Sequence, residues 1–566
     1  MSTSESAGVP PERQGGASPF GPFRHPAYSV IWIATVVANT GSWMYAAAAG
    51  WLMTSLDPSP LMVSLVQVAD TLPMLFLAIP AGALADIIDK RRLLITVEVC
   101  IALCSSVFAV LVWFQVVTAP ILLAFMFAIG AGAAVTAPSW QSIVPMLVPK
   151  QDLPAAVAAN SVGVNISRAI GPALGGALIA FFGIAAPFGI NGVSNVGTIG
   201  ALWWWRPPQK PPSKLPAESF LGAVRTGIRH ARANPPLRAT LVRVLAFFPF
   251  GSAYWALLPL VSRTQIEGGP ELYGILLGAI GAGAIAGAGF MHRIRTALGA
   301  DGLVAAGTIG TAVALVLYGV AHQPWTAIVA SLLAGMSWIA VLASLNVSAQ
   351  VALPNWVRGR GLAIYVTFMF GGLAFGSAIW GELAGLIGLA GAHFLAAAGC
   401  LVFAVLTWRW KLQTGAALDF MPSMHWPAPI VALDVEGDRG PVLVTVEYHV
   451  VEGSRGKFVA GMQRIGRERR RDGAYGWGVF EDVATPGRFL EIFQLESWVE
   501  HMRQHARVTN ADRVTEESLQ AILSEPARVT HLVAPDGEDG NELSEDVEGP
   551  DIAGAGPSQR GGSSSR

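Results

Sequence analysis

The chain has 566 residues, of which 52% are hydrophobic and only 13% are charged, and it contains 63 glycines and 18 tryptophans. Soluble domains carry about 25% charged residues, so this composition excludes a disordered chain, a disulfide-rich scaffold and an ordinary cytosolic enzyme. Long apolar stretches separated by short charged loops are typical of proteins that cross a membrane several times. The three cysteines lie within these apolar stretches and are expected to be packing residues.

Residues 1–27 are polar and aperiodic, which predicts a disordered cytoplasmic tail without the pattern of a cleaved signal peptide. Between Tyr28 and Lys411 we find twelve apolar segments, each long enough to cross a hydrocarbon core of about 30 Å as a helix. They lack the alternating pattern of a β-barrel, so they predict an all-α membrane protein. The predicted spans are 28–54, 61–85, 93–116, 121–147, 154–182, 187–205, 239–264, 271–294, 300–320, 325–352, 361–387 and 391–411.

Basic residues lie almost entirely in the even-numbered connections between these spans. The odd-numbered connections hold essentially one, Arg263. Because positively charged loops stay in the cytoplasm, this asymmetry predicts that the even-numbered loops and both termini are cytoplasmic. The expected location is a bacterial inner membrane or a plasma membrane, with the lipid bilayer as surroundings.

The spans form two six-helix halves, 28–205 and 239–411, separated by a predicted cytoplasmic loop at 206–238. The halves repeat at an offset of about 205 residues. A parallel repeat of this kind predicts a binding site at the membrane midplane, about which the halves rock. The matched pairs are Gly130 with Gly335, Ser139 with Ser344, Pro149 with Pro354, Gly171 with Gly376, Gly176 with Gly381, and Gly183 with Gly388.

The remainder of the chain has a different composition. A Pro-rich linker, 412–440, precedes the segment 441–535, which is as charged as a soluble domain, and residues 536–566 are expected to be disordered. The order β-α-β-β-α-β predicts a small α+β domain with a ferredoxin-like sandwich in the cytoplasm. We predict strands at 442–451, 476–482, 488–497 and 529–533, and helices at 454–471 and 498–524, the last broken near Thr509.

A short motif ends the second span and begins the third. An Asp at a helix end holds neighbouring basic groups, and a small residue permits a tight turn. The motif resembles signature A of the major facilitator superfamily, although Asp89 and Ile87 replace its usual glycine and basic residue. The resemblance implies that residues 28–411 have that fold and that Asp86 helps hold a cytoplasmic gate closed; the alternative is an ordinary basic loop. The matching residues are Gly82, Leu84, Asp86, Lys90 and Arg91.

The dipeptide Gly171-Pro172 lies in the fifth span, where small residues let helices approach closely and proline bends a helix. It resembles the Gly-Pro motif that exporters of the superfamily carry in this helix. The resemblance implies export rather than uptake, and simple helix packing is the alternative.

Two charges lie near the centre of the first half, Asp70 and Arg168. Burying an arginine there costs at least about 2.5 kcal/mol, so such a residue normally faces a cavity or a partner. We predict that Asp70 couples transport to protons or acts as a counter-ion, and that Arg168 pairs with it or binds an anion. The alternative is an ion pair with a purely structural role. Glu382 is the second candidate for proton coupling, while Glu98 is predicted to lie near the membrane interface.

In this superfamily helices 1, 4, 7 and 10 line the cavity, and the resemblance implies the same here. Aromatic walls with few fixed charges suit amphipathic or lipophilic molecules. The expected cavity residues are Asn39, Trp43, Trp140, Gln141, Trp255, Trp338 and Asn346.

In the C-terminal segment, His501 and His505 share one helix face. No further ligand is evident nearby, so the sequence predicts no metal site there. The segment resembles the extra domain of the transmembrane secretion effector subgroup, which includes relatives of the enterobactin exporter. That domain is similar to the dimeric α+β barrel of antibiotic-biosynthesis monooxygenases. The resemblance implies self-association or regulation, and fold alone implies no activity.

No nucleotide-binding loop of the type G-x-x-x-x-G-K-[ST] occurs, which argues against an ATP-driven pump, and no flavin or haem motif suggests a cofactor. The basic run 464–471 is interrupted by Glu468 and is not typical of a nucleic-acid site. We therefore predict a secondary transporter that exports a siderophore or drug-like molecule in exchange for protons. The alternative is a membrane-anchored enzyme or sensor whose C-terminal domain is the active part.

Overall fold

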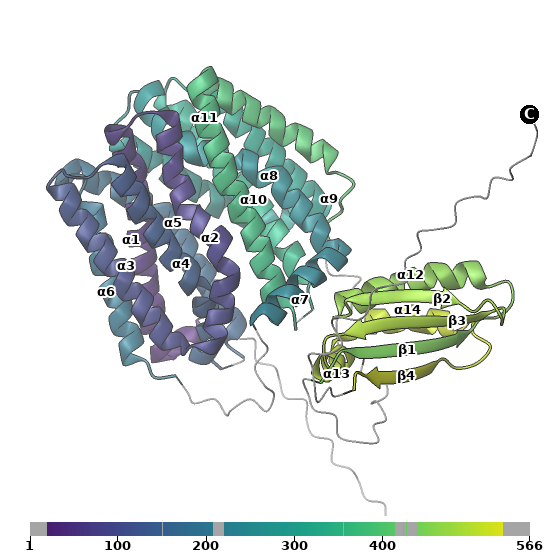
Figure 1. Ribbon diagram of the computed structural model, residues 1–566. Helices are drawn as coiled ribbons and strands as arrows, with labels where there is room; N and C mark the ends of the chain where they lie inside the picture. Colours follow the sequence, from purple (N-terminus) through teal and green to yellow (C-terminus); the bar gives the residue numbers. More distant parts are fainter. Residues whose placement is uncertain are drawn as a thin grey trace, which may run out of the picture. The chain divides into compact units, whose positions relative to one another are not determined.

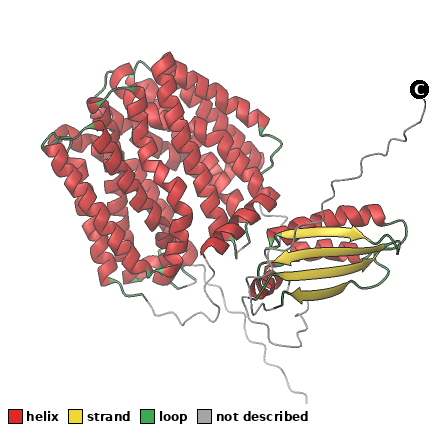
Figure 2. Ribbon diagram, in the orientation of Figure 1, coloured by secondary structure: helices red, strands yellow, loops and turns green. Residues whose placement is uncertain are grey.

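The structure is a computed structural model that describes residues 20–149, 151–207, 220–354, 356–413, 423, 426 and 439–535. The chain divides into two compact units, residues 1–421 and residues 422–566. In the described residues the first unit is entirely helical, and the second combines helices with one sheet (Figures 1 and 2).

Six long helices follow a short 3-10 turn at Gly21–Arg24. Most begin with a proline in the first turn, where its missing N–H costs nothing. The third is capped by Asp89, whose carboxylate accepts a hydrogen bond from the Arg92 amide at 2.8 Å. The helices are α1 (Pro26–Leu56), α2 (Pro60–Ile87), α3 (Lys90–Trp113), α4 (Ala119–Leu147), α5 (Leu153–Phe182) and α6 (Ala186–Trp204).

The described residues of this unit contain five further helices, and two of them are long because each joins two helical stretches across a break. Gly299 and Gly388 have φ of 70° and 78°, which glycine adopts without strain, and each separates two helical stretches. The helices are α7 (Phe220–Ala233), α8 (Pro235–Leu260) with a π-turn at Val261–Gln265, α9 (Pro270–Gly319), α10 (Pro324–Val351) and α11 (Arg358–Leu406).

The structure differs from the sequence prediction on both sides of the second half. The segment predicted as an inter-half loop contains α7, and α8 begins before residue 239 because Asn234 caps it by accepting from the Leu237 amide at 3.1 Å. At the other end α11 stops at Leu406, and Arg243 donates to the Trp410 carbonyl at 3.1 Å. In the described residues, nine segments are long and apolar enough to cross a membrane.

The glycines of the internal repeat make equivalent contacts in the two halves. A Cβ on Gly130 of α4 would lie 2.4 Å from the carbonyl oxygen of Asp70 on α2. A Cβ on Gly335 of α10 would lie 1.9 Å from the carbonyl oxygen of Ile280 on α9. Both positions therefore exclude any larger residue, because a neighbouring backbone occupies the space.

A second pair of repeated glycines brings the halves themselves together. A Cβ on Gly176 of α5 would lie 2.7 Å from the Pro270 carbonyl oxygen of α9. Its counterpart, Gly381 of α11, would place a Cβ 3.0 Å from the Pro60 carbonyl oxygen of α2. Each half thus contributes one small-residue contact to the other, as a two-fold repeat requires.

The second unit contains a four-stranded antiparallel sheet in the order β2-β3-β1-β4. The predicted order of strands and helices is confirmed, and the predicted break near Thr509 is a capping box that this residue forms with Asp512. The elements are β1 (Val442–His449), α12 (Arg455–Arg471), β2 (Gly476–Glu481), β3 (Arg488–Leu495), α13 (Trp498–Arg507), α14 (Asn510–Gln520) and β4 (Arg528–Val533).

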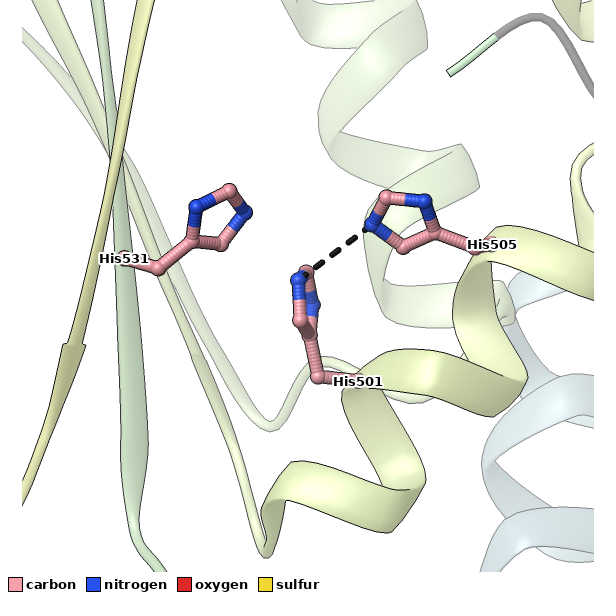
Figure 3. Close-up of side chains that lie close together, drawn as sticks. All are labelled: His501, His505 and His531. Atoms are coloured by element: carbon pink, nitrogen blue, oxygen red, sulfur yellow. Dashed lines mark hydrogen bonds between the residues drawn. The ribbon is translucent and has the colours of Figure 1, made fainter. Parts of the chain in front are cut away.

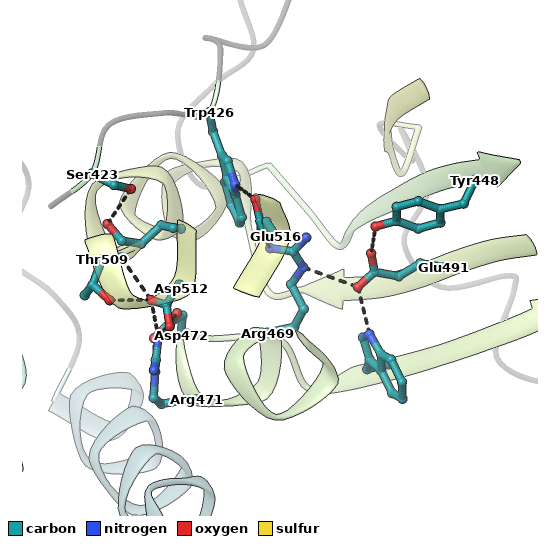
Figure 4. Close-up of polar contacts among 12 residues, drawn as sticks. Ser423, Trp426, Tyr448, Arg469, Arg471, Asp472, Glu491, Thr509, Asp512 and Glu516 are labelled. Carbon is teal, nitrogen blue, oxygen red and sulfur yellow. Dashed lines mark hydrogen bonds and ion pairs between the residues drawn. The ribbon is translucent and has the colours of Figure 1, made fainter. Parts of the chain in front are cut away.

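A buried charge cluster joins α12 to the sheet (Figure 4). Arg469 lies 3.3 Å from Glu491 on β3 and 3.1 Å from Glu516 on α14. Glu491 is fully buried and also accepts hydrogen bonds from Tyr448 and Trp477, at 2.7 and 2.8 Å. Burial alone would lower the pKa of Arg469, but the carboxylates outweigh it and keep the pKa above its ordinary value.

The cluster predicts a large effect of Arg469→Met on the C-terminal unit. The substitution leaves Glu491 buried without its counter-charge, which lowers the free energy of unfolding by about 3–5 kcal/mol. Hydrogen exchange of β1 and β3 in the full-length protein measures this change.

Arg455→Met is the matched control on the same helix, because Arg455 is 68% exposed where it pairs with Glu481. It should leave the exchange of both strands nearly unchanged. Equal effects of the two substitutions would contradict a stabilising role of the buried cluster.

Candidate functional site

A cavity of about 340 Å³ lies among α1, α4 and α5 in the first half. Three of the predicted cavity residues line it together, Asn39, Trp140 and Gln141. Tyr28 of α1 is part of the cavity wall, and its hydroxyl donates a hydrogen bond to the Ala156 carbonyl of α5 at 2.9 Å. The described cavity is mainly aromatic and aliphatic, and amide and hydroxyl side chains are its polar features.

Three predicted tryptophans form a row that crosses from one half to the other. The ring of Trp43 on α1 lies 6.5 Å from that of Trp255 on α8. Trp255 in turn lies 5.7 Å from Trp338 on α10, at an interplanar angle of 70°. The last predicted cavity residue, Asn346, lies further along α10 and accepts a hydrogen bond from Gln350.

Arg168 of α5 lies against this row. Its guanidinium carbon is 5.3 Å from the centre of the Trp43 ring, within range of a cation–π interaction. Its buried Nε has no hydrogen-bond partner among the described residues. The ion pairs of the described residues do not include one between Arg168 and Asp70. The guanidinium of Arg168 instead lies against the ring of Trp43.

The carboxylates of the spans differ in burial. Asp70 is half-buried on α2, and its backbone touches Gly130 of α4. Glu382 is exposed on α11. Glu98 is only 7% exposed, and it faces inward on α3, beside Trp140. The sequence showed that Glu98 lies in a span but not which face of the helix it occupies.

The residues of the signature-like motif lie at the junction of α2 and α3. The Asp86 side chain and the surroundings of Gly82 lie outside what the structure describes. Lys90 is the first residue of α3. Arg91 donates from Nε to the Leu202 carbonyl at 2.7 Å, and thus satisfies the C-terminal end of α6.

The Gly171-Pro172 pair lies between two helices. A Cβ on Gly171 would lie 2.9 Å from the Thr40 carbonyl oxygen of α1. On the other side, the Pro172 carbonyl oxygen lies 2.8 Å from where Gly274 of α9 would carry a Cβ. The motif therefore packs α5 against its own half and against the other half at once.

Arg263 makes a contact between the halves that sequence reasoning missed. From the π-turn after α8 it donates to the Thr54 hydroxyl at 2.8 Å and to Ser55, both on α1. It also lies 5.5 Å from the ring centre of Trp51, which stacks on Tyr273 of α9. The sequence did contain a signal for this contact: Arg263 is essentially the one basic residue in the odd-numbered connections between the predicted spans.

The C-terminal unit has a larger cavity, of about 940 Å³, between its helices and the inner face of the sheet. Arg469 and three histidines line it. Burial lowers the pKa of His501 to about 3 and that of His505 to about 4, and it also lowers the pKa of His531. At neutral pH these three imidazoles are therefore uncharged.

Comparison with known proteins places these features in a family. The sequence model of the family described as transmembrane secretion effector matches residues 17–538. The staphyloferrin A transporter of Staphylococcus aureus is 25% identical over 247 residues, which is 43% of this chain and 62% of the relative. The enterobactin exporter EntS of Shigella flexneri is 24% identical over 396 residues, 68% of this chain and 91% of the relative.

The transporter YfiS of Bacillus subtilis is 26% identical over 268 residues, and the chain spans 62% of its length, as it does for the staphyloferrin A transporter. In both cases the chain therefore spans less than two thirds of the relative's own length. Among solved structures, the nucleoside transporter NupG has a TM-score of 0.55 at 11% identity, covering 68% of this chain and 99% of that one. A POT family transporter in complex with a thioalcohol-conjugated peptide has a TM-score of 0.55 at 13% identity, covering 67% and 95%. These two likenesses show the fold.

The contacts of Arg263 predict that it holds two helices of different halves together. In a variant without native cysteines, a single cysteine introduced by Ser64→Cys replaces a fully buried residue of α2 and should react slowly with maleimide. Adding Arg263→Gln removes about 1.5 kcal/mol of charge-assisted hydrogen bonding, and the reaction should then be about tenfold faster.

Arg263→Lys should give an intermediate rate, because the charge remains but the two-hydroxyl contact does not. The exposed Arg409→Gln is the control and should leave the rate unchanged. Indistinguishable rates for Arg263→Gln and Arg409→Gln would show that the contact does not hold the halves together.

Proposed function

We propose that this chain, which belongs to the transmembrane secretion effector family of the major facilitator superfamily, exports a small organic molecule in exchange for protons. The chain is a membrane-spanning transporter, and the family and the matched relatives are transporters rather than enzymes. The row of Trp43, Trp255 and Trp338 between the halves carries the proposal, because it offers an aromatic surface for a bulky substrate.

The names of two relatives support a siderophore as substrate. One is a staphyloferrin A transporter and one is an enterobactin exporter, at 25% and 24% identity. The aromatic and amide lining of the described cavity suits such amphipathic molecules, and equally a drug-like compound. The Gly171-Pro172 motif supports export as the direction.

We further propose twelve spans, with both termini in the cytoplasm of a bacterium. Within the described ranges, nine segments satisfy the length and hydropathy that a span needs. The others are α1, which has 31 residues, α6 and the second part of α11. The repeat supports the last two, since Gly183 and Gly388 have φ of 84° and 78° at the corresponding helix ends that precede them. The basic residues of the even-numbered connections support the orientation.

Alternating access is the mechanism we propose. The contacts of Gly176 with Pro270 and of Gly381 with Pro60 lie where α9 and α2 begin, which the proposed orientation puts on the outside. Arg263 lies at the same end. The small cavity of the first half lies toward the other end, so these positions support a state that is closed outside and open inside.

Asp70 is the proposed proton-coupling residue, because a charge within a span is costly and α2 contacts both α4 and the opposite half. Arg168 would adjust the proton affinity of Asp70 or bind an anionic group of the substrate. Glu382 is the second candidate for proton coupling. Asp86, with Lys90 and Arg91, would latch the inner gate.

For the C-terminal unit we propose self-association or regulation, as its similarity to dimeric α+β barrels implies. Its sheet has an outer face with exposed apolar side chains, including Phe480 at 57%, Leu490 at 39% and Leu532 at 49% exposure. A second copy of the sheet would cover them. The cavity of about 940 Å³ in this unit favours a sensor as the second candidate function of the chain.

Proton flux in inverted membrane vesicles tests the proposal. A pH-sensitive dye reports collapse of a preset gradient when catecholates or lipophilic cations are added. We expect substrate-dependent collapse in the wild type and in Glu267→Gln, an exposed loop carboxylate. We expect none in Asp70→Asn, since it can no longer exchange a proton.

Collapse that persists in Asp70→Asn at equal expression would exclude this residue as the coupling group, and Glu382→Gln and Glu98→Gln would then be compared. Transport that survives Asp70→Asn but is lost on removing residues after 421 would favour the sensor.

A further inference from the structure

We propose that His501, His505 and His531 bind a divalent transition metal ion such as Zn²⁺, with one coordination position open to the cavity of the C-terminal unit (Figure 3). This site is additional to the proposed transport function and does not depend on it. Two of the histidines are visible in the sequence as a helical pair, and only the fold adds the third.

The spacing of the three imidazoles fits a metal. His501 and His505 lie one turn apart on α13, and their Nε2 atoms are 3.3 Å from each other. In a tetrahedral site with Zn–N bonds of about 2.0–2.1 Å, two ligand nitrogens are also about 3.3 Å apart. His531 comes from the inner face of β4, and one ligand atom of each histidine lies within 4.8 Å of the others.

The rings converge on one point from two elements. Figure 3 shows His501 and His505 extending from α13 toward the strand that carries His531. The ring centres of His501 and His531 are 4.7 Å apart, and those of His501 and His505 are 4.8 Å apart. Imidazole nitrogens are ligands that suit Zn, Cu, Fe and Ni, so the donor set indicates this group of metals.

The ring nitrogen of His501 that does not face His505, Nδ1, lies beside a buried amide side chain. His501 is 1% exposed, and its Nδ1 has no hydrogen-bond partner among the described residues. The same is true of both polar atoms of Gln504, which is fully buried beside it. Metal-bound histidines normally donate their other ring N–H to a neighbour, and the Gln504 amide oxygen is placed for this role.

The charged side chains that line the cavity are of both signs, which is compatible with a bound cation. A fixed positive charge, Arg469, lines the cavity and is paired with two carboxylates, Glu491 and Glu516. These three groups sum to one negative charge. Glu525 also lines the cavity, so carboxylates lie on its wall together with Arg469.

Three protein ligands leave the fourth position of a tetrahedral site open, as in metal sites that take water or an added ligand. Here the open side is the cavity of about 940 Å³, whose wall includes Tyr448 and Trp426. A small ligand therefore has access to the open position from the cavity.

Metal binding to the full-length protein in detergent tests the site. The protein is purified through a tag without histidine, stripped with chelator, incubated with Zn²⁺ and passed through a desalting column. Elemental analysis should find one tightly held ion per chain in the wild type. His505→Gln and His531→Gln, which change half-buried residues, should weaken binding at least about tenfold.

His449→Gln is the control, since His449 lies on β1 of the same sheet and pairs with Glu447 at 3.1 Å. It should retain the ion. Equal Zn²⁺ content in the wild type and the His505 and His531 variants, with unchanged hydrogen exchange of β1, would overturn the site.

Co²⁺ in place of Zn²⁺ reports the open position. The wild type should give the visible absorption of four-coordinate Co²⁺, and acetohydroxamate, a chelator with two oxygen donors, should change that spectrum. A Co²⁺ spectrum that the chelator leaves unaltered would support the metal but overturn the open position.

Discussion

Close contact between helix backbones determines how the two halves of the membrane unit meet. Lipid gives helices no hydrophobic reason to associate, so packing at small residues has to supply the attraction. Gly176 and Gly381 provide it between the halves, and Gly130 and Gly335 provide it within each half, in every case against a neighbouring backbone atom. A side chain at these positions would separate the helices, and the arrangement of the interior would be lost.

The interior follows from this arrangement. With α1, α8 and α10 placed by the glycine contacts of their neighbours, Trp43, Trp255 and Trp338 come into a row. Arg168 then lies against the face of Trp43. A charge on an aromatic surface between two halves is well placed to respond to a substrate, which is why the transport proposal rests on this region.

Much of the fold could be predicted from the sequence because it depends on local properties. Hydropathy and proline placed α4 and α5 to within two residues of their ends. The alternating pattern of β1 and the turn signals indicated the succession of strands and helices along the C-terminal unit. What could not be predicted depends on which helix face meets which neighbour: Glu98 faces inward, and His531 joins two histidines from another element.

The mechanism we propose is that the halves rock about a site between them at the membrane midplane, so that the glycine contacts at the outer end separate as the inner end closes. Spin-label distances in the full-length protein test it most directly, with one pair outside at Asp57 and Glu267 and one pair inside at Gln151 and Arg293. On acidification, our account predicts that the outer distance lengthens while the inner distance shortens, and that Asp70→Asn abolishes both changes. Distances that stay constant, or that change in the same direction at both ends, would contradict rocking between the halves.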